Sequence, residues 1–218
     1  MEWPEDLVPI LRYLPGDTAS AWVKLAPVVP ASAYLIGGTA LTVHLRHRVS
    51  RDLDFALAQH EDIPAARERI EVVGLLAVIE QDEGTLNALF ERTRIQFLDT
   101  STQQLLVEPT LIAGIKVAGV EDIAAMKMKV ILDRGAMRDY FDLMELDHRR
   151  VIPAEDALRL MLERYQPQSP DETLMAVVRS LGYLDDVEPD PALPISGEEI
   201  ARYWSKRQPQ VVRNLARW

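Results

Sequence analysis

The sequence predicts an α+β fold, in which a domain with a mixed, mostly antiparallel sheet (residues 1–120) precedes a helical domain (residues 121–218). Short segments of alternating apolar and polar residues occupy the first part and favour strands. From residue 121 onward the apolar residues recur at helical spacing, with breaks at Gly135, at Pro153 and at two proline-rich turns. This change of period places the domain boundary near residue 120.

The first part is expected to alternate short helices and strands. In chain order, we expect helices over 4–13 and 17–29, a strand ending in a glycine turn in ASAYLIGG (31–38), a helix in TALTVHLRH (39–47), a strand in RDLDFALA (51–58) and a helix over 63–74. Candidate strands over 75–80, 85–91 and 94–99 are spaced like an antiparallel meander, and GIKVAGV (114–120) supplies a last extended segment. The second part is expected to contain helices over 121–134, 137–148, 154–165, 171–181 and 196–214.

Composition limits the class of protein. The absence of cysteine excludes disulfides and thiolate chemistry and fits a cytoplasmic location. No apolar run approaches the ~20 residues of a membrane span, and the acidic start MEWPEDLVPI is unlike a signal peptide. The net charge of −10 argues against broad, non-specific nucleic-acid binding. The basic tail from Arg202 to Trp218 is either a local phosphate-facing patch or a solvated helix face that balances acidic neighbours.

Two aspartates lie inside the second expected strand. Residues two apart in a strand point to the same side, so Asp52 and Asp54 share a face, with Ser50 in line. Neighbouring carboxylates repel one another unless a cation intervenes. Because Mg²⁺ binds hard oxygen ligands and leaves room for water and phosphate, the pair is a candidate metal site. The alternative is a half-exposed edge strand whose aspartates are bridged by Arg48 or Arg51.

A pair of glycines, Gly37 and Gly38, precedes a helix that is expected to begin near Thr39. The free N–H groups and the dipole at a helix N-terminus attract anions, and glycine lets a phosphate approach the backbone. Taken alone, the two glycines favour an ordinary tight turn. Beside the acidic strand, however, the turn would place an anion site next to a metal site, which is what a nucleoside triphosphate requires.

The combined pattern GGTAL…HRVSRDLDF resembles the signature of the AbiEii/AbiGii-type nucleotidyltransferase toxins, in the DNA polymerase β-like superfamily. The resemblance implies a polymerase β-like nucleotidyltransferase domain in which Asp52 and Asp54 hold Mg²⁺ or Mn²⁺ and act in catalysis. It further implies a set of nucleotide-binding residues in and after the glycine turn. These are Gly37, Gly38, Thr39, Arg48 and Ser50.

The segment EDIAAMKMKVILDRGAMRDYFDL (121–143) resembles the downstream motif of that family, a helical lysine followed by RDxxDL. Helical spacing places Lys127 on the inward stripe, where a lysine must snorkel or meet an anion, whereas Lys129 has a more solvent-facing register. The resemblance implies that Lys127 contacts the nucleotide phosphates and that Asp142 completes the catalytic set. From the residues alone, a surface ion pair between Asp142 and Arg138 is the alternative.

Two arginines near this motif, Arg134 and Arg138, are candidate phosphate partners because a guanidinium binds phosphate bidentately.

The sequence departs from the superfamily where a later strand usually carries a third carboxylate. The corresponding segment is TRIQFLDT (93–100), with Gln96 at the inward register and Asp99 at the end. Either Asp99 bends into the site, or a helical carboxylate, Asp142 or Asp139, supplies the third acid. We expect Asp142.

The resemblance implies a Mg²⁺-dependent enzyme that moves a nucleoside monophosphate from a nucleoside triphosphate to an acceptor. The acceptor would be an RNA, such as a tRNA, or a protein. The family further implies a toxin of a toxin–antitoxin or abortive-infection system, with an antitoxin protein as partner. The missing strand carboxylate motivates an alternative, a catalytically inert module on the same fold that binds a nucleotide or a partner.

Overall fold

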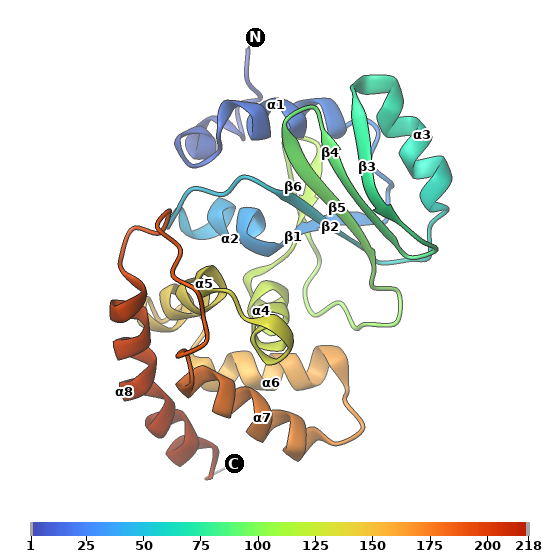
Figure 1. Cartoon of the computed structure of the whole chain (residues 1–218). Coiled ribbons are helices and arrows are strands. Elements are labelled where there is room, and N and C mark those ends of the chain that lie inside the picture. The colour runs from blue at the N-terminus through green and yellow to red at the C-terminus, as the bar shows by residue number, and fades with distance from the viewer. Residues whose placement is uncertain (1, 217–218) are drawn as a thin grey trace. The chain divides into compact units, whose positions relative to one another are not determined.

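The computed structural model describes residues 2–216, apart from the side chain of Arg134. The chain divides into two compact units, Met1–Gly119 and Val120–Trp218 (Figure 1). The first unit contains all the strands of the described chain, and the second contains helices alone. None of the helices in the described residues is long and apolar enough to cross a membrane.

The first unit is built on one seven-stranded sheet with the strand order β3-β4-β5-β2-β1-β7-β6. Its elements are η1 (Val8–Tyr13), α1 (Gly16–Leu25), β1 (Ala33–Ile36), α2 (Gly37–Leu45), β2 (Leu53–Leu57), α3 (Ile63–Val73), β3 (Leu76–Gln81), β4 (Thr85–Phe90), β5 (Thr93–Asp99), β6 (Thr110–Ile112) and β7 (Ile115–Val117). The β2–β5 and β1–β7 pairs are parallel, and the other pairs are antiparallel. The predicted α+β class with a mixed, mostly antiparallel sheet is therefore confirmed.

One face of this sheet forms the core of the first unit. Phe55 of β2 stacks on Phe97 of β5, with 4.8 Å between the ring centroids. Phe90 of β4 faces α3, since a Cβ added at Gly74, the residue after α3, would lie 2.5 Å from the Phe90 ring. All three phenylalanines are fully buried. Side chains alternate along a strand, so on each strand the residues next to the phenylalanine point to the opposite face.

The opposite face carries polar side chains in register across four strands. Asp54 of β2 pairs with Gln96 of β5, Gln96 pairs with Asn87 of β4, and Asn87 pairs with Glu80 of β3. Asp54, Gln96 and Asn87 are half-buried, and Glu80 is exposed. This row begins at the predicted acidic strand and continues away from it.

The second unit contains α4 (Val120–Arg134), α5 (Met137–His148), α6 (Ala154–Tyr165), α7 (Pro170–Gly182) and α8 (Gly197–Leu215). Helix α8 begins with a capping box, in which Ser196 Oγ accepts from the Glu199 backbone N–H and the Glu199 carboxylate accepts from the Ser196 N–H. The buried Trp204 indole donates to the Tyr140 carbonyl at 3.0 Å and ties α8 to α5. A fully buried ion pair between Arg164 and Asp122 ties α6 to α4.

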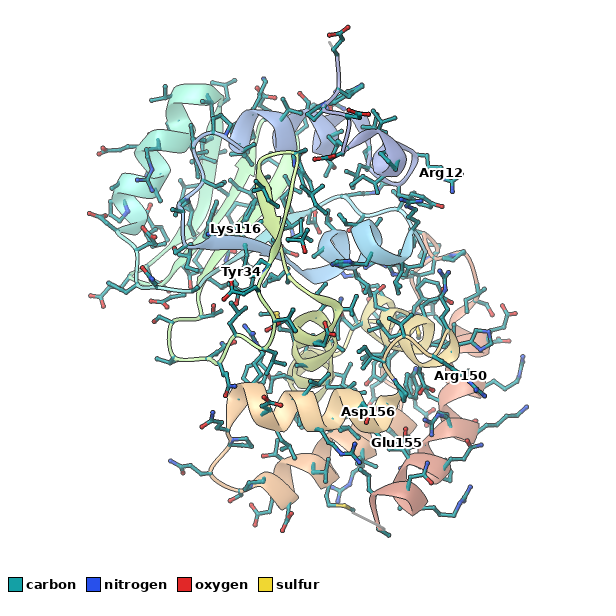
Figure 2. The ribbon with its side chains drawn as sticks, turned by 180° about the vertical axis from the view of Figure 1, so that it is seen from behind. Arg12, Tyr34, Lys116, Arg150, Glu155 and Asp156 are labelled. Carbon is teal, nitrogen blue, oxygen red and sulfur yellow. The ribbon has the colours of Figure 1, made fainter. Side chains whose placement is uncertain are left out.

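Polar contacts also hold α8 in place. The Arg207 guanidinium donates to Asp147 of α5 at 2.8 Å and to Glu155 of α6 at 2.9 Å. Asn214 adds a donor to Glu155 at 2.6 Å. Figure 2 labels Glu155 and its neighbour Asp156 on α6. The first joins this network, while Asp156 pairs with Arg159 on the exposed surface.

Candidate active site

The glycine turn and the acidic strand are in direct contact. Strand β1 ends at Ile36, α2 begins at Gly37, and Ile36 is the register partner of Asp54. Gly37 has φ +70°, and a Cβ there would lie 2.7 Å from Asp54 Oδ2. A side chain at this position would therefore be strained by its backbone and would displace the Asp54 carboxylate.

The second glycine makes room for a different group. A Cβ at Gly38 would overlap the Arg48 guanidinium and would lie 3.2 Å from Ser50 Oγ. The first turn of α2 therefore has a carboxylate on one glycine and a guanidinium on the next. The open N–H groups of this helix N-terminus, with the adjacent arginine, suit a triphosphate.

Buried hydroxyls hold the loop between α2 and β2 against the helix. Thr39 Oγ1 donates to the Asp52 carbonyl at 2.5 Å and lies 2.8 Å from Ser50 Oγ. Thr42 Oγ1 donates to the Arg48 carbonyl at 3.2 Å. Thr39 and Ser50 are buried, so these bonds position the arginine and the aspartates around the turn. The structure thus gives these hydroxyls a positioning role, which the sequence pattern had not indicated.

The acidic pair suits a divalent cation chemically. Asp52 directly precedes β2 and Asp54 is its second residue, so alternation points both to one side. Both residues are half-buried, which leaves their hard oxygen donors accessible. Among the described residues, no group of three or more histidine, aspartate or glutamate side chains is gathered for a metal. Two carboxylates can hold such an ion, with water and phosphate oxygens completing its coordination.

A third acid from β5 does not lie beside this pair. Asp99 pairs in register with Leu57, at the far end of β2 from Asp54. Its carboxylate accepts from the Ser101 backbone N–H at 2.8 Å and lies 2.9 Å from His60 Nδ1. Hydrogen bonds with the Ser101 side chain, with His60 and with the Ser101 backbone lower the pKa of Asp99. Of the two alternatives for the third acid, the one in which Asp99 bends into the site does not describe this structure, because the residue that pairs with Asp54 is Gln96.

The second predicted cluster forms a buried ion-pair triad within the helical unit. Lys127 Nζ lies 2.5 Å from Asp139 Oδ1 and 2.8 Å from Asp142 Oδ2. Lys127 is 7% exposed and Asp142 is 0% exposed, so the inward register predicted for the lysine is confirmed. The remaining oxygen of Asp139 accepts from the Ala136 N–H at 3.1 Å and caps α5. The anions that Lys127 meets thus include two carboxylates of its own unit.

Of the two candidate phosphate-binding arginines near this triad, the structure describes the side chain of Arg138 but not that of Arg134. Arg138 is exposed, and Asp142 pairs with Lys127, so the surface pair between Asp142 and Arg138 does not describe this site. The side chain of Arg134 lies outside the described part of the chain. Lys129 pairs with Asp133 on the surface at 2.6 Å, as its solvent-facing register predicted.

Sequence reasoning missed two residues beside the acidic pair. Arg94 and Asn87 share the sheet face of Gln96, by alternation along β5 and by register with β4. Alternation in TRIQFLDT would have placed Arg94 there. The position of Asn87 depends on the register between β4 and β5, which sequence alone leaves open.

Comparison with known proteins yields a family and several relatives. The model of the family described as "Nucleotidyl transferase AbiEii toxin, Type IV TA system" matches residues 28–217. A protein of Aquifex aeolicus (strain VF5), described as uncharacterized protein aq_aa25, is 28% identical over 177 residues, which cover 79% of this chain and 81% of the relative.

Two solved structures share the fold. A crystal structure described as a nucleotidyltransferase from H. pylori has a TM-score of 0.56 and 19% identity, covering 96% of this chain and 97% of its own. The crystal structure of JHP933 from Helicobacter pylori has a TM-score of 0.55 and 17% identity, covering 99% of this chain and 96% of the JHP933 chain.

Proposed function

Because the chain belongs to the AbiEii family of toxin nucleotidyltransferases, we propose that it transfers a nucleoside monophosphate from a nucleoside triphosphate to an RNA acceptor such as a tRNA, with Mg²⁺ or Mn²⁺ as cofactor. The observation that carries this proposal is the contact between the glycine turn and the acidic strand. A Cβ at Gly37 would meet Asp54 at 2.7 Å, so an anion bound at the turn would lie next to a carboxylate. Such a pairing requires a bridging cation.

In this proposal the residues of the first unit hold the triphosphate. The N-terminal N–H groups of α2 and the Arg48 guanidinium bind phosphate oxygens, while Thr39 and Ser50 keep the loop in place. Asp52 and Asp54 would hold the divalent cation, which when bound would neutralise the triphosphate and the departing pyrophosphate.

The transfer itself is a substitution at phosphorus. The acceptor hydroxyl oxygen forms a bond to the α-phosphorus, and the bond from that phosphorus to the bridging oxygen of the β-phosphate breaks. Pyrophosphate leaves with the electron pair, and the hydroxyl proton passes to water. The glycine turn and Arg48 act by position and charge, which supply most of the catalysis in reactions of this class.

We propose that the helical unit also takes part. Lys127 would exchange one of its two carboxylate contacts for a nucleotide phosphate, and Asp142 would act with the aspartates of β2. The burial of Lys127 and its ion pairs with two carboxylates support this role, because they hold the ammonium group among acidic oxygens, one of which a phosphate oxygen could replace.

Transfer of label from nucleoside triphosphates tests the proposal. The protein is incubated with each α-labelled triphosphate, Mg²⁺ and total RNA or a cell extract, alongside Asp54→Asn and a surface control, Glu68→Gln on α3. We expect label on RNA with the wild type and the control, and none with Asp54→Asn. Label on protein alone would replace the RNA acceptor by a protein acceptor.

The amide of Gln96 stands where the superfamily usually has a third carboxylate. It therefore favours a second candidate function, an inert nucleotide-binding or partner-binding module. Binding of a triphosphate with Mg²⁺, without label transfer to RNA or protein, would support it.

Finally, we propose an antitoxin protein as the partner. Growth arrest on expression, relieved by the product of a neighbouring gene and absent with Asp54→Asn, would support that partnership.

A further inference from the structure

A strip of polar side chains continues from the acidic pair across the sheet. Gln96 lies next to Asp54 in register, and Asn87 lies next to Gln96. The Asn87 amide donates to Glu80 at 2.7 Å, which fixes the amide plane and leaves its oxygen as an acceptor. Both amides are half-buried, so they are held by their neighbours while still reaching the surface. Strand β5, where the superfamily usually has a third carboxylate, and its neighbour β4 thus present neutral groups that both donate and accept hydrogen bonds.

An arginine and a leucine border this strip. Arg94 lies two residues before Gln96, hence on the same face, and its register partner is Leu89. Leu89 is 36% exposed, and Arg94 is exposed, with no hydrogen-bond or ion-pair partner among the residues that the structure describes. By contrast, the nearby Arg92 pairs with Asp17 at 3.3 Å. A solvated guanidinium needs no explanation by itself. This one, however, stands on the same face as the acidic pair.

We propose that this strip, composed of Arg94, Gln96, Asn87 and Leu89, binds the nucleic-acid acceptor and directs its attacking hydroxyl toward Asp54. The inference rests on the proposed nucleotidyl transfer and assigns its acceptor side. Arg94 would bind an acceptor phosphate, the amides would bind base or ribose edges, and Leu89 would pack on a base or sugar.

The amide at Gln96 suits this role better than a carboxylate would. A carboxylate beside Asp52 and Asp54 would add a third negative charge and repel the acceptor phosphates. Glutamine donates and accepts hydrogen bonds without charge. An amide does not take up a proton at neutral pH. In this proposal Gln96 therefore orients the acceptor hydroxyl without acting as a base, and the hydroxyl proton passes to water. The strip is therefore a means by which a protein of net charge −10 can bind RNA locally.

Binding of RNA without turnover tests the strip. The probe is a short fluorescein-labelled single-stranded RNA of mixed sequence, followed by fluorescence anisotropy at several salt concentrations. Arg94→Glu is compared with Arg69→Glu, which changes another exposed arginine, on α3, the helix on the opposite face of the sheet. We expect Arg94→Glu to weaken binding roughly 10-fold and to reduce the salt slope by about 1, while Arg69→Glu stays within about 2-fold of the wild type.

A second variant separates hydrogen bonding from folding. Gln96→Glu keeps the size of the side chain, and we expect it to bind Mn²⁺ more tightly, as read by calorimetry, while binding the RNA more weakly. Gln96→Leu should weaken RNA binding and leave Mn²⁺ binding unchanged. Opposite effects of one substitution on two ligands cannot arise from a loss of fold. A Gln96→Glu protein that binds both ligands as the wild type does would overturn the assignment.

The outcomes distinguish this inference from the proposed function. Equal effects of Arg94→Glu and Arg69→Glu, or no RNA binding by the wild type, overturn the strip even if label is transferred to protein. RNA binding that depends on Arg94, in a protein that transfers no label, supports the strip and removes the proposed catalysis.

Discussion

At the scale of single residues, the site depends on two glycines that leave no space for a side chain. Gly37 has a left-handed backbone and touches Asp54, and Gly38 touches Arg48. Both neighbours carry the charges that the proposed chemistry needs. The conformational freedom of glycine and its small size are therefore required together at Gly37, whereas only the small size is required at Gly38.

Gly37→Ala should disable nucleotide binding at a modest cost in stability. The positive φ costs about 1 kcal/mol for alanine, and the added Cβ must push Asp54 away from the turn. We expect the thermal shift produced by a triphosphate with Mg²⁺ to disappear. Gly114→Ala is the control for backbone strain, since its φ is +82° and its Cβ would meet only Ala26. A Gly114→Ala protein that also loses the shift would show that strain, not the site, is responsible.

Asp54→Asn should stabilise the protein when no metal is present. Removing one of two neighbouring carboxylates relieves their repulsion, and residues at functional sites are commonly not the most stable choice. We expect a melting temperature in EDTA equal to or above that of the wild type, and no rise on addition of Mg²⁺. The wild type should gain stability with Mg²⁺ in proportion to the logarithm of its concentration. An Asp54→Asn protein that still responds to Mg²⁺ would place the ion elsewhere.

At the scale of elements, the periodic segments could be predicted and the pairing of distant strands could not. The helices expected over 137–148 and 154–165 have those bounds in the structure, because amphipathic spacing and local breaks determine them. The meander of β3, β4 and β5 also follows from local spacing. Strand β6 was missed, since three residues show too little alternation. The parallel β2–β5 pair, which brings Gln96 to Asp54, depends on contacts far apart in the chain.

Helix α8 illustrates the same division between local and distant information. The helix expected over 196–214 was found at Gly197–Leu215, but the contacts of its basic residues could not be predicted. Arg207 lies among Asp147, Glu155 and Asn214, so this base of the tail balances acidic neighbours and does not face phosphate. Burial raises the pKa of Glu155, yet the hydrogen bonds from Arg207 and Asn214 outweigh burial and hold that pKa below its usual range.

Arg207→Met should destabilise the helical unit in a pH-dependent way. The substitution leaves two largely buried carboxylates without their cation, at a cost of about 2–3 kcal/mol near neutral pH. Since the folded-state pKa of Glu155 is lowered, its contribution is complete above about pH 5 and is lost as the pH falls through that pKa. The difference between the two proteins in urea unfolding should therefore shrink in acid. Lys206→Met, on the exposed side of α8, should show no such difference at either pH.

At the scale of the whole molecule, the net charge is negative, but several arginines lie near the acidic pair in the sequence or on its sheet face. The chain carries −10, yet the loop before β2 contains Arg46, Arg48 and Arg51, and Arg94 lies on the sheet face that begins at Asp54. The negative charge thus keeps non-specific nucleic acid away, while local arginines can hold phosphates next to the acidic pair. This distribution fits an enzyme that binds a defined acceptor.

The proposal that the helical unit serves the same reaction leads to a test with paired lysines. Lys127→Met removes the cation of the buried triad and should lower the affinity for a triphosphate with Mg²⁺ by roughly 10- to 100-fold, as expected for a buried charged contact worth about 1.5–3 kcal/mol. Lys129→Met removes a half-buried lysine of the same helix, paired with Asp133, and should leave the affinity unchanged. Isothermal titration calorimetry measures both.

Stability has to be separated from binding in this comparison, because Lys127→Met removes the cation that pairs with two buried carboxylates, at a cost of about 3–5 kcal/mol. Adding Asp139→Asn removes one of those charges and should restore part of the lost stability. If Lys127 contacts the nucleotide, the double variant regains part of the lost melting temperature while its affinity stays low. If the affinity recovers together with the stability, Lys127 is a structural residue of the helical unit, and the phosphate contacts belong to the first unit alone.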